Sequence, residues 1–277
     1  MLYFTSIKLL NSGPLLAVFI ILGGFIYMKK LLVLLSLLGS TISMANQIAI
    51  IGAMDSEIKN LLTQMKDVTV ETNASVTFHK GLLNNKKVIV FKSGIGKVNA
   101  AMSTTMALEK YDIDKIIFTG VAGAVNNKLN IADIVISKDL VQYDYDTTVF
   151  GTKLGMVPGS TNGRFIPNKE LINIAKKSAD KILINHKAYI GTIATGDQFI
   201  ADKVKVKSLQ DNFNAMAVEM EGASVAQVAN LYNVPFVVIR SMSDKADGSA
   251  HMNYNEFEQI AADNSVKIVK EMLNQIN

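Results

Sequence analysis

Short apolar runs rich in β-branched residues alternate with amphipathic stretches along most of this chain, and no other feature constrains its fold as strongly. The runs predict strands at Gln47–Ile51, Val88–Phe91, Ile116–Phe118, Ile134–Ile136, Tyr189–Ala194 and Phe236–Ile239. Helical spacing predicts helices at Asp55–Met65, Lys97–Lys110, Asn168–Lys181, Met220–Leu231 and Glu256–Ile276. The predicted strands are almost continuously apolar, as in strands that are buried on both faces. The alternation therefore predicts an α/β three-layer sandwich, in which helices flank a central mixed sheet.

The first 45 residues differ in composition from the rest and contain no Asp or Glu. Their charged residues are Lys8, Lys29 and Lys30, so removing these three positive charges lowers the formal net charge from +4 to +1. The basic character of the chain belongs mostly to this leader and does not indicate a nucleic-acid-binding surface. We assign residues 46–277 to a single domain, which is a common size for one α/β unit.

From Met28 onward, the leader has the organisation of a secretory signal. Lys29-Lys30 provide a positive start, an apolar region follows, and Ser43-Met44-Ala45 forms a small-x-small cleavage motif. This pattern predicts that translation starts at Met28, that residues 1–27 are an upstream extension, and that the protein is periplasmic or secreted. A membrane anchor is the alternative, but the apolar run at 14–27 is shorter than the roughly 20 residues that span a bilayer. A leader that does not act as a signal would leave the protein in the cytoplasm.

Six glycine-rich or acidic turns stand where strands are expected to end. They are Gly52–Glu57, Ser93–Lys97, Thr119–Gly123, Thr195–Phe199, Val218–Glu221 and Arg240–Asp244. Ligands of open α/β sheets bind at the carboxyl ends of the strands. We therefore expect these turns to line one cleft.

Single residues in these turns leave two interpretations open. An exposed Phe199 could stack on a base, but it could equally be a core side chain. Glu219 and Glu221 lie too close in sequence to share a helix face, so one could bind ribose hydroxyls while the other is structural. Both could instead complement a helix dipole. Asp244 ends a buried strand, where desolvation favours a proton donor, yet an N-cap aspartate is also common.

Cysteine is absent from the chain, which excludes disulfides and thiolate metal sites. The three histidines His79, His186 and His251 do not have the spacing of a metal-binding motif. We therefore expect no metal.

Taken together, the turns resemble those of the 5′-methylthioadenosine/S-adenosylhomocysteine nucleosidases, within the nucleoside phosphorylase/hydrolase superfamily. The resemblance covers residues 47–275 in order and implies a nucleoside phosphorylase-like fold. The motifs that carry it are IAIIGAMDSEI, KSGIGKVNAA, FTGVAGA, YDYDTTVFG, MVPG, TGDQFI, AVEMEGASVA and PFVVIRSMSD.

The resemblance implies a role for each matching residue. Glu57 is expected to activate water for attack at C1′ of ribose, and Asp244 to protonate N7 of adenine. Glu221 is expected to bind the ribose hydroxyls, Phe199 to stack on adenine, and Ser243 to orient Asp244. The remaining expected substrate contacts are Met54, Ala122, Gly123, Ile200, Met220, Arg240 and Tyr254. In a homodimer, the neighbouring subunit would complete the 5′-thioalkyl pocket with Phe150 and Pro158.

Water is the expected nucleophile because the first turn carries Asp55 and Glu57, and carboxylates repel phosphate. Acid–base cleavage of an N-glycosidic bond needs no cofactor. Two departures from the family pattern are Val121, where a serine is common, and Ala124, where a glycine is. The alternatives are a phosphate-dependent purine nucleoside phosphorylase and an exported, non-catalytic nucleoside-binding protein. The 5′-substituent is not fixed: 5′-deoxyadenosine and 6-amino-6-deoxyfutalosine are further candidate substrates.

Overall fold

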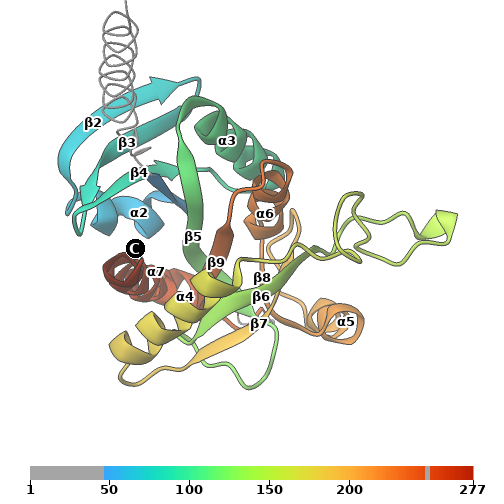
Figure 1. Cartoon of the computed structure of the whole chain (residues 1–277). Coiled ribbons are helices and arrows are strands. Elements are labelled where there is room, and N and C mark those ends of the chain that lie inside the picture. The colour runs from blue at the N-terminus through green and yellow to red at the C-terminus, as the bar shows by residue number, and fades with distance from the viewer. Residues whose placement is uncertain (1–46, 247–249, 277) are drawn as a thin grey trace, which may run out of the picture. The chain divides into compact units, whose positions relative to one another are not determined.

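The predicted alternation of strands and helices is confirmed in a computed structural model, which describes residues 47–246 and 250–276 (Figure 1). The strands are β1 (Gln47–Gly52), β2 (Lys66–Asn73), β3 (Val76–Leu83), β4 (Lys86–Lys92), β5 (Ile113–Ala124), β6 (Ile134–Gln142), β7 (Ala188–Thr195), β8 (Ala215–Glu219) and β9 (Phe236–Asp244). The helices are α2 (Asp55–Leu62), α3 (Lys97–Lys110), α4 (Lys169–Ile182), α5 (Lys203–Phe213), α6 (Gly222–Leu231) and α7 (Ala250–Gln275), with a 3₁₀ turn η1 (Thr148–Phe150).

The described strands form one nine-stranded mixed sheet in the order β2-β3-β4-β1-β5-β8-β7-β6-β9. Strand β5 also pairs in parallel with β9, so β5, β8, β7, β6 and β9 close into a ring. The twelve-residue β5 is long enough to pair with β1 and β9 and, at its end, with β8. The closure brings several strand ends to one place.

Helices cover both faces of the sheet, as the α/β sandwich prediction requires (Figure 1). Alternate residues of β1 enter different cores, because successive strand side chains point to opposite faces. Ala49 and Ile51 pack with residues of α3 and α6, whereas Ile48 and Ile50 pack with residues of α2, α4 and α7. This two-sided burial explains the continuous apolar character of the strand.

The sequence patterns did not predict the β2–β3 hairpin, α5 or β8. All eight residues of β2 are exposed, so this edge strand lacks the apolar run that marks the inner strands. The helix predicted from Met220 begins two residues later than expected. Val218 and Glu219 end β8, Glu221 is the N-cap residue, and α6 begins at Gly222.

The stretch 142–167 is irregular, as predicted, and contains η1 as a single turn. It runs away from the sheet, and η1 lies near its tip (Figure 1). Its polar anchor is an ion pair between Lys97 Nζ and Asp144 Oδ1 at 2.6 Å, at the start of α3. The segment therefore begins beside one of the glycine-rich turns.

The predicted signal segment lies outside the described residues. Within the described part of the chain, no helix has the length and apolarity needed to span a membrane.

Candidate active site

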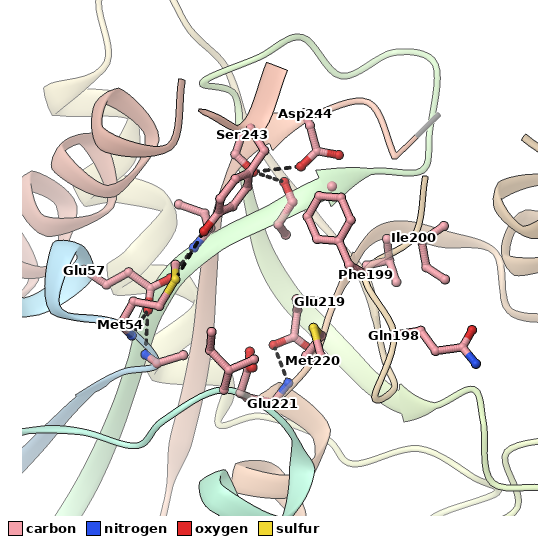
Figure 2. A pocket seen from close by; sticks show the side chains of 17 residues that line it. Met54, Glu57, Gln198, Phe199, Ile200, Glu219, Met220, Glu221, Ser243 and Asp244 are labelled. Carbon is pink, nitrogen blue, oxygen red and sulfur yellow. Dashed lines mark hydrogen bonds between the residues drawn. The ribbon is translucent and has the colours of Figure 1, made fainter. Parts of the chain in front are cut away.

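A cavity of about 310 Å³ lies at the carboxyl ends of the strands, where the glycine-rich and acidic turns were expected to meet. Its volume is at the lower end of the range for small-molecule pockets. Figure 2 shows the side chains around it. They are Ala53, Met54, Glu57, Ile95, Val121, Ala122, Gly123, Gln198, Phe199, Ile200, Val218, Glu219, Met220, Glu221, Ser243, Asp244 and Tyr254.

Glu57 lies in the first turn of α2 and is held by three backbone amides. Its Oε2 accepts from Ala53 N at 2.5 Å and Met54 N at 3.0 Å, and its Oε1 accepts from Val121 N at 2.9 Å. Burial raises the pKa of Glu57, opposed by the charge of Arg240 and by these hydrogen bonds. The result is an oriented carboxyl group with a higher proton affinity than an exposed glutamate, as a general base near neutral pH requires.

Asp244 ends β9 and is buried together with Ser243. Its Oδ2 accepts from Ser243 Oγ at 2.9 Å, and its Oδ1 accepts from Ala246 N at 2.7 Å. A register shift between Ala122 and Gly123 places Gly123 opposite Asp244. A side chain at Gly123 would meet Asp244 Oδ1 at 2.9 Å, so the bare glycine leaves room for the carboxyl group.

Glu221 is the N-cap residue of α6, and its Oε1 accepts from Gly96 N at 2.8 Å. Burial, and after it the charge of Glu219, raise the pKa of this carboxyl group to about 8, against the opposing effects of Arg240 and the Gly96 hydrogen bond. The site therefore favours the protonated form of Glu221 at neutral pH.

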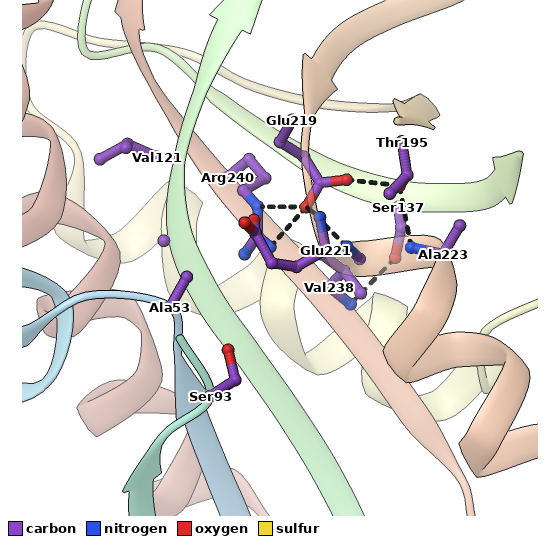
Figure 3. A network of polar contacts seen from close by, with 12 residues as sticks. Ala53, Ser93, Val121, Ser137, Thr195, Glu219, Glu221, Ala223, Val238 and Arg240 are labelled. Atoms are coloured by element: carbon purple, nitrogen blue, oxygen red, sulfur yellow. Dashed lines mark hydrogen bonds and ion pairs between the residues drawn. The ribbon is translucent and has the colours of Figure 1, made fainter. Parts of the chain in front are cut away.

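Glu219 and Arg240 form a buried ion pair behind the cavity (Figure 3). Two N–H groups of Arg240, at Nη2 and Nε, donate to Glu219 Oε2 at 2.7 and 3.2 Å. Arg240 does not line the cavity, although a substrate contact was predicted for it. Its guanidinium lies 4.1 Å above the Phe118 ring centroid and is almost fully buried.

An aromatic pair, Phe199 and Tyr254, lines the cavity. Phe199 is 50 % exposed, so it is not a core residue. Its ring meets Tyr254 edge-on, with centroids 5.6 Å apart and planes at 85°. The Tyr254 hydroxyl donates to Met54 Sδ at 3.2 Å. Burial raises the pKa of Tyr254, which keeps the phenol protonated.

The cavity brings together every other predicted catalytic and substrate-contacting residue of this chain. Phe150 and Pro158, predicted to serve a neighbouring subunit, do not line it and are exposed. The predicted site residues did not include Ala53, Ile95, Val121, Gln198, Val218 and Glu219. Each of them lies in or beside a strand-end turn, and this position could have predicted them. Whole turns line the cavity, and not only the residues with acidic or aromatic side chains.

Four buried carboxyl groups line the cavity, from Glu57, Glu219, Glu221 and Asp244. The described lining residues include no Lys or Arg. Among residues 47–246 and 250–276, no group of three or more His, Cys, Asp or Glu side chains has an arrangement suited to a metal ion. The arrangement is suited to acid–base chemistry on a ligand with a flat ring and hydroxyl groups.

The fold and this cavity define a nucleoside-processing enzyme. The chain belongs to the phosphorylase superfamily, whose family model matches residues 47–274, and within it to the 5′-methylthioadenosine/S-adenosylhomocysteine nucleosidase family. It is 42 % identical to the nucleosidase of that name from Bacillus cytotoxicus over 231 residues, which cover 83 % of this chain and 99 % of the relative.

Solved structures agree with this assignment. The Neisseria meningitidis 5′-methylthioadenosine/S-adenosylhomocysteine nucleosidase, in complex with methylthio-immucillin-A, matches with a TM-score of 0.80 and 35 % identity over 83 % of this chain and 100 % of its own. A futalosine hydrolase of Helicobacter pylori matches with a TM-score of 0.80 and 38 % identity, over 84 % of this chain and 99 % of its own. The predicted family and fold are thus confirmed.

Proposed function

We propose that the protein hydrolyses the N-glycosidic bond of 5′-methylthioadenosine and S-adenosylhomocysteine, releasing adenine and the 5-thioribose derivative. The observation that carries this proposal is the presence of two buried, oriented acids, Glu57 and Asp244, on one cavity. Breaking the bond leaves positive charge on the ribose and negative charge on the adenine. A base for the water and an acid for the leaving group stabilise these two changes.

Glu57 activates the water. In its ionised form it takes a proton from the water as the oxygen attacks C1′ of the ribose. The three backbone N–H groups fix the direction of the carboxylate before the reaction, so little reorganisation is needed. Val121 contributes through its backbone N–H, which its side chain does not affect.

Asp244 serves the leaving group by giving a proton to N7 of adenine. Ser243 Oγ donates to the Oδ2 of Asp244 and fixes the rotation of the carboxyl group. The exposed ring of Phe199 offers a stacking surface for the base, and such stacking is worth roughly 1–3 kcal/mol per base. Glu221 then accepts from the ribose hydroxyls.

The charge of the cavity favours water over phosphate as the nucleophile. A phosphate would lie beside the Glu57 carboxylate, and the described lining residues include no Lys or Arg. At about 4 Å and an effective dielectric constant near 20, this like-charge pair would cost on the order of 4 kcal/mol.

Adenine release tests the proposal directly. Purified protein is incubated with 5′-methylthioadenosine or S-adenosylhomocysteine in phosphate-free buffer, and adenine is followed by chromatography. We expect release from both substrates, with a rate that added phosphate does not increase. Strict phosphate dependence would instead identify a phosphorylase. Saturable binding without product would identify a nucleoside-binding protein.

Related 5′-modified adenosines extend the proposal. The futalosine hydrolase among the structural relatives motivates 6-amino-6-deoxyfutalosine as a third substrate. The 5′-deoxy analogue of adenosine, 5′-deoxyadenosine, is a fourth candidate. The ratio of kcat/KM values among the four compounds ranks them. If the protein cleaves neither 6-amino-6-deoxyfutalosine nor 5′-deoxyadenosine, its activity is restricted to thioethers.

We also propose that the active protein is a homodimer. Val149 and Phe150 are 86 % and 82 % exposed at the tip of the irregular segment, which is unusual for large apolar side chains. A second apolar stripe, Ile95, Val98 and Met102, is exposed at and beyond the start of α3, and Ile95 also lines the cavity. Such surfaces suit a neighbouring copy that completes the 5′ end of the cavity.

The compartment is a separate proposal, based on the signal-like pattern from Met28 to Ala45. We propose export followed by cleavage after Ala45. Sequencing the N-terminus of the protein from its native cells tests this. A start at Asn46 is expected, whereas an intact Met1 or Met28 would refute cleavage.

A further inference from the structure

One guanidinium lies among three buried carboxyl groups behind and beside the cavity. Arg240 pairs with Glu219, and its charge also acts on Glu57 and Glu221. The single cation therefore cannot neutralise all three acids. How its charge is divided among them decides which carboxyl group is ionised at a given pH.

Glu219 has every feature of a fixed structural acid. Its Oε2 accepts two N–H groups of Arg240 and the backbone N–H groups of Glu221 and Gly222, the latter at 2.7 Å. Its Oε1 accepts from the hydroxyl of Thr195, which in turn accepts from Ala223 N at 2.9 Å (Figure 3). These donors occupy both oxygens, so little capacity is left for a ligand, although the residue lines the cavity.

Arg240 and Glu57 both lie beside Gly120, where a side chain would otherwise stand. A Cβ atom added at Gly120 would lie 2.5 Å from Glu57 Oε1 and 3.1 Å from Arg240 Nη1. Both groups therefore lie against the same bare Cα. No ion pair joins Glu57 to Arg240 among the described contacts within 4.0 Å, so the cation acts on the base through space.

We propose that Glu219 is a positioning residue for the hydrolysis: it holds Arg240 at the back of Glu57 and offsets part of its charge, which sets the pH at which Glu57 becomes a competent base. This proposal rests on the proposed function. It assigns to Glu219 no contact with the substrate.

The remaining charged and titratable groups near Glu57 have other partners. Glu221 and Tyr254 face the same cavity, and Asp55 pairs with Lys92 at the surface. On α7, Glu258 and Asp263 accept hydrogen bonds from Ser56 and Asn60 of α2. Among the residues that the structure describes, Arg240 is the cation whose charge lowers the pKa of Glu57.

Two variants with opposite expected effects test the proposal. Glu219→Gln keeps the shape of the side chain but leaves the Arg240 charge unopposed, which stabilises the Glu57 carboxylate. In a plot of the single-turnover rate against pH, the acidic limb is the rise in rate as Glu57 ionises. This limb should then move to lower pH by about one unit. The double variant Glu219→Gln/Arg240→Met removes the cation without leaving a buried orphan charge, and the limb should move to higher pH than in the unmodified protein.

Titration of Glu57 itself makes the result independent of turnover. Carbon-13 NMR of glutamate carboxyl groups, assigned by loss of one signal in Glu57→Gln, should show the same two opposite shifts. Asp55→Asn, in the same turn but exposed, should shift neither measurement. Shifts in the same direction, or no shift in either variant, would overturn the proposal. An unmodified protein without hydrolysis would refute the proposed function, while the NMR titration would still decide the role of Glu219.

Discussion

At the scale of single residues, the cavity shows how environment separates acids of the same type. Glu219 is buried but saturated with donors, whereas Glu221 is buried with one backbone donor. Burial opposes the ionisation of Glu221, and its single backbone donor and the charge of Arg240 compensate for this only in part. Glu219 therefore suits a structural role, and Glu221 remains free to exchange its partner for a ligand hydroxyl.

Loss of either proposed catalytic acid should remove most of the activity. We expect Glu57→Gln and Asp244→Asn each to lower kcat by at least about 100-fold, the usual minimum for acid–base catalysis. Adenine release under saturating substrate measures this effect. Asp55→Asn is the matched control, since Asp55 is exposed in the same turn, and it should retain nearly full activity. Substantial turnover by either acid variant would refute the role of that acid.

Glu221 should make the folded protein less stable as the pH rises. Its pKa is raised to about 8 in the fold from an ordinary value of 4.5, so between these values the unfolded chain binds fewer protons than the folded protein. The contribution of this group to the free energy of unfolding is thus fully present below about pH 4.5. It is lost as the pH rises from there through 8. Relative to the unmodified protein, Glu221→Gln should gain stability between pH 5 and pH 8, while KM rises.

Urea unfolding at pH 5 and pH 8 measures the gain. Asp202→Asn, on the surface at the start of α5, should show no such difference between the two pH values. A Glu221→Gln stability difference that stays constant across this range would contradict the expected ionisation. An unchanged KM would contradict the proposed contact with the ribose.

At the scale of elements, sequence reasoning succeeded where hydrophobic pattern and turn chemistry agree. The helix predicted at 97–110 has the observed bounds, and the strand-end turns meet at one cavity. It failed for β2, because an exposed edge strand has no apolar run, and for the start of α6. The position of Arg240 was also not predictable, because its contact with Glu219 depends on the pairing of β5 with both β8 and β9.

The N-cap of α5 should contribute measurably to stability. Asp202 Oδ1 accepts from Val204 N at 2.8 Å and Lys205 N at 2.9 Å, so two otherwise unpaired amides depend on it. We expect Asp202→Ala to lower the free energy of unfolding by about 1 kcal/mol, measured by urea denaturation. Asp211→Ala is the control, because its ion pair with Lys207 on the same helix is exposed and should contribute less than about 0.5 kcal/mol. Equal effects would contradict the capping role.

At the scale of the whole molecule, sheet closure gathers distant parts of the chain around one small cavity. Glu57 comes from the first helix after β1, whereas Asp244 ends β9, and β5 pairs with both β1 and β9. The site is therefore made by topology and not by a local motif. Its apolar border continues to Ile95, next to the exposed side chains of α3. The molecular surface thus links the cavity to a candidate subunit contact.

Assembly should be required for full substrate affinity. Phe150 is 82 % exposed on η1, and burying a large aromatic side chain against a second copy would gain about 1.5–3 kcal/mol. Phe150→Asp should therefore weaken dimerisation and raise KM for 5′-methylthioadenosine while the fold stays intact, because the side chain lies outside the buried cores. Light scattering coupled to size exclusion gives the oligomeric state, and adenine release gives KM. Ile184→Asp is the matched control, since Ile184 is 93 % exposed at the end of α4 and lies outside the cavity lining. A fully active monomer would refute the dimer proposal, because the cavity would then be complete within one chain.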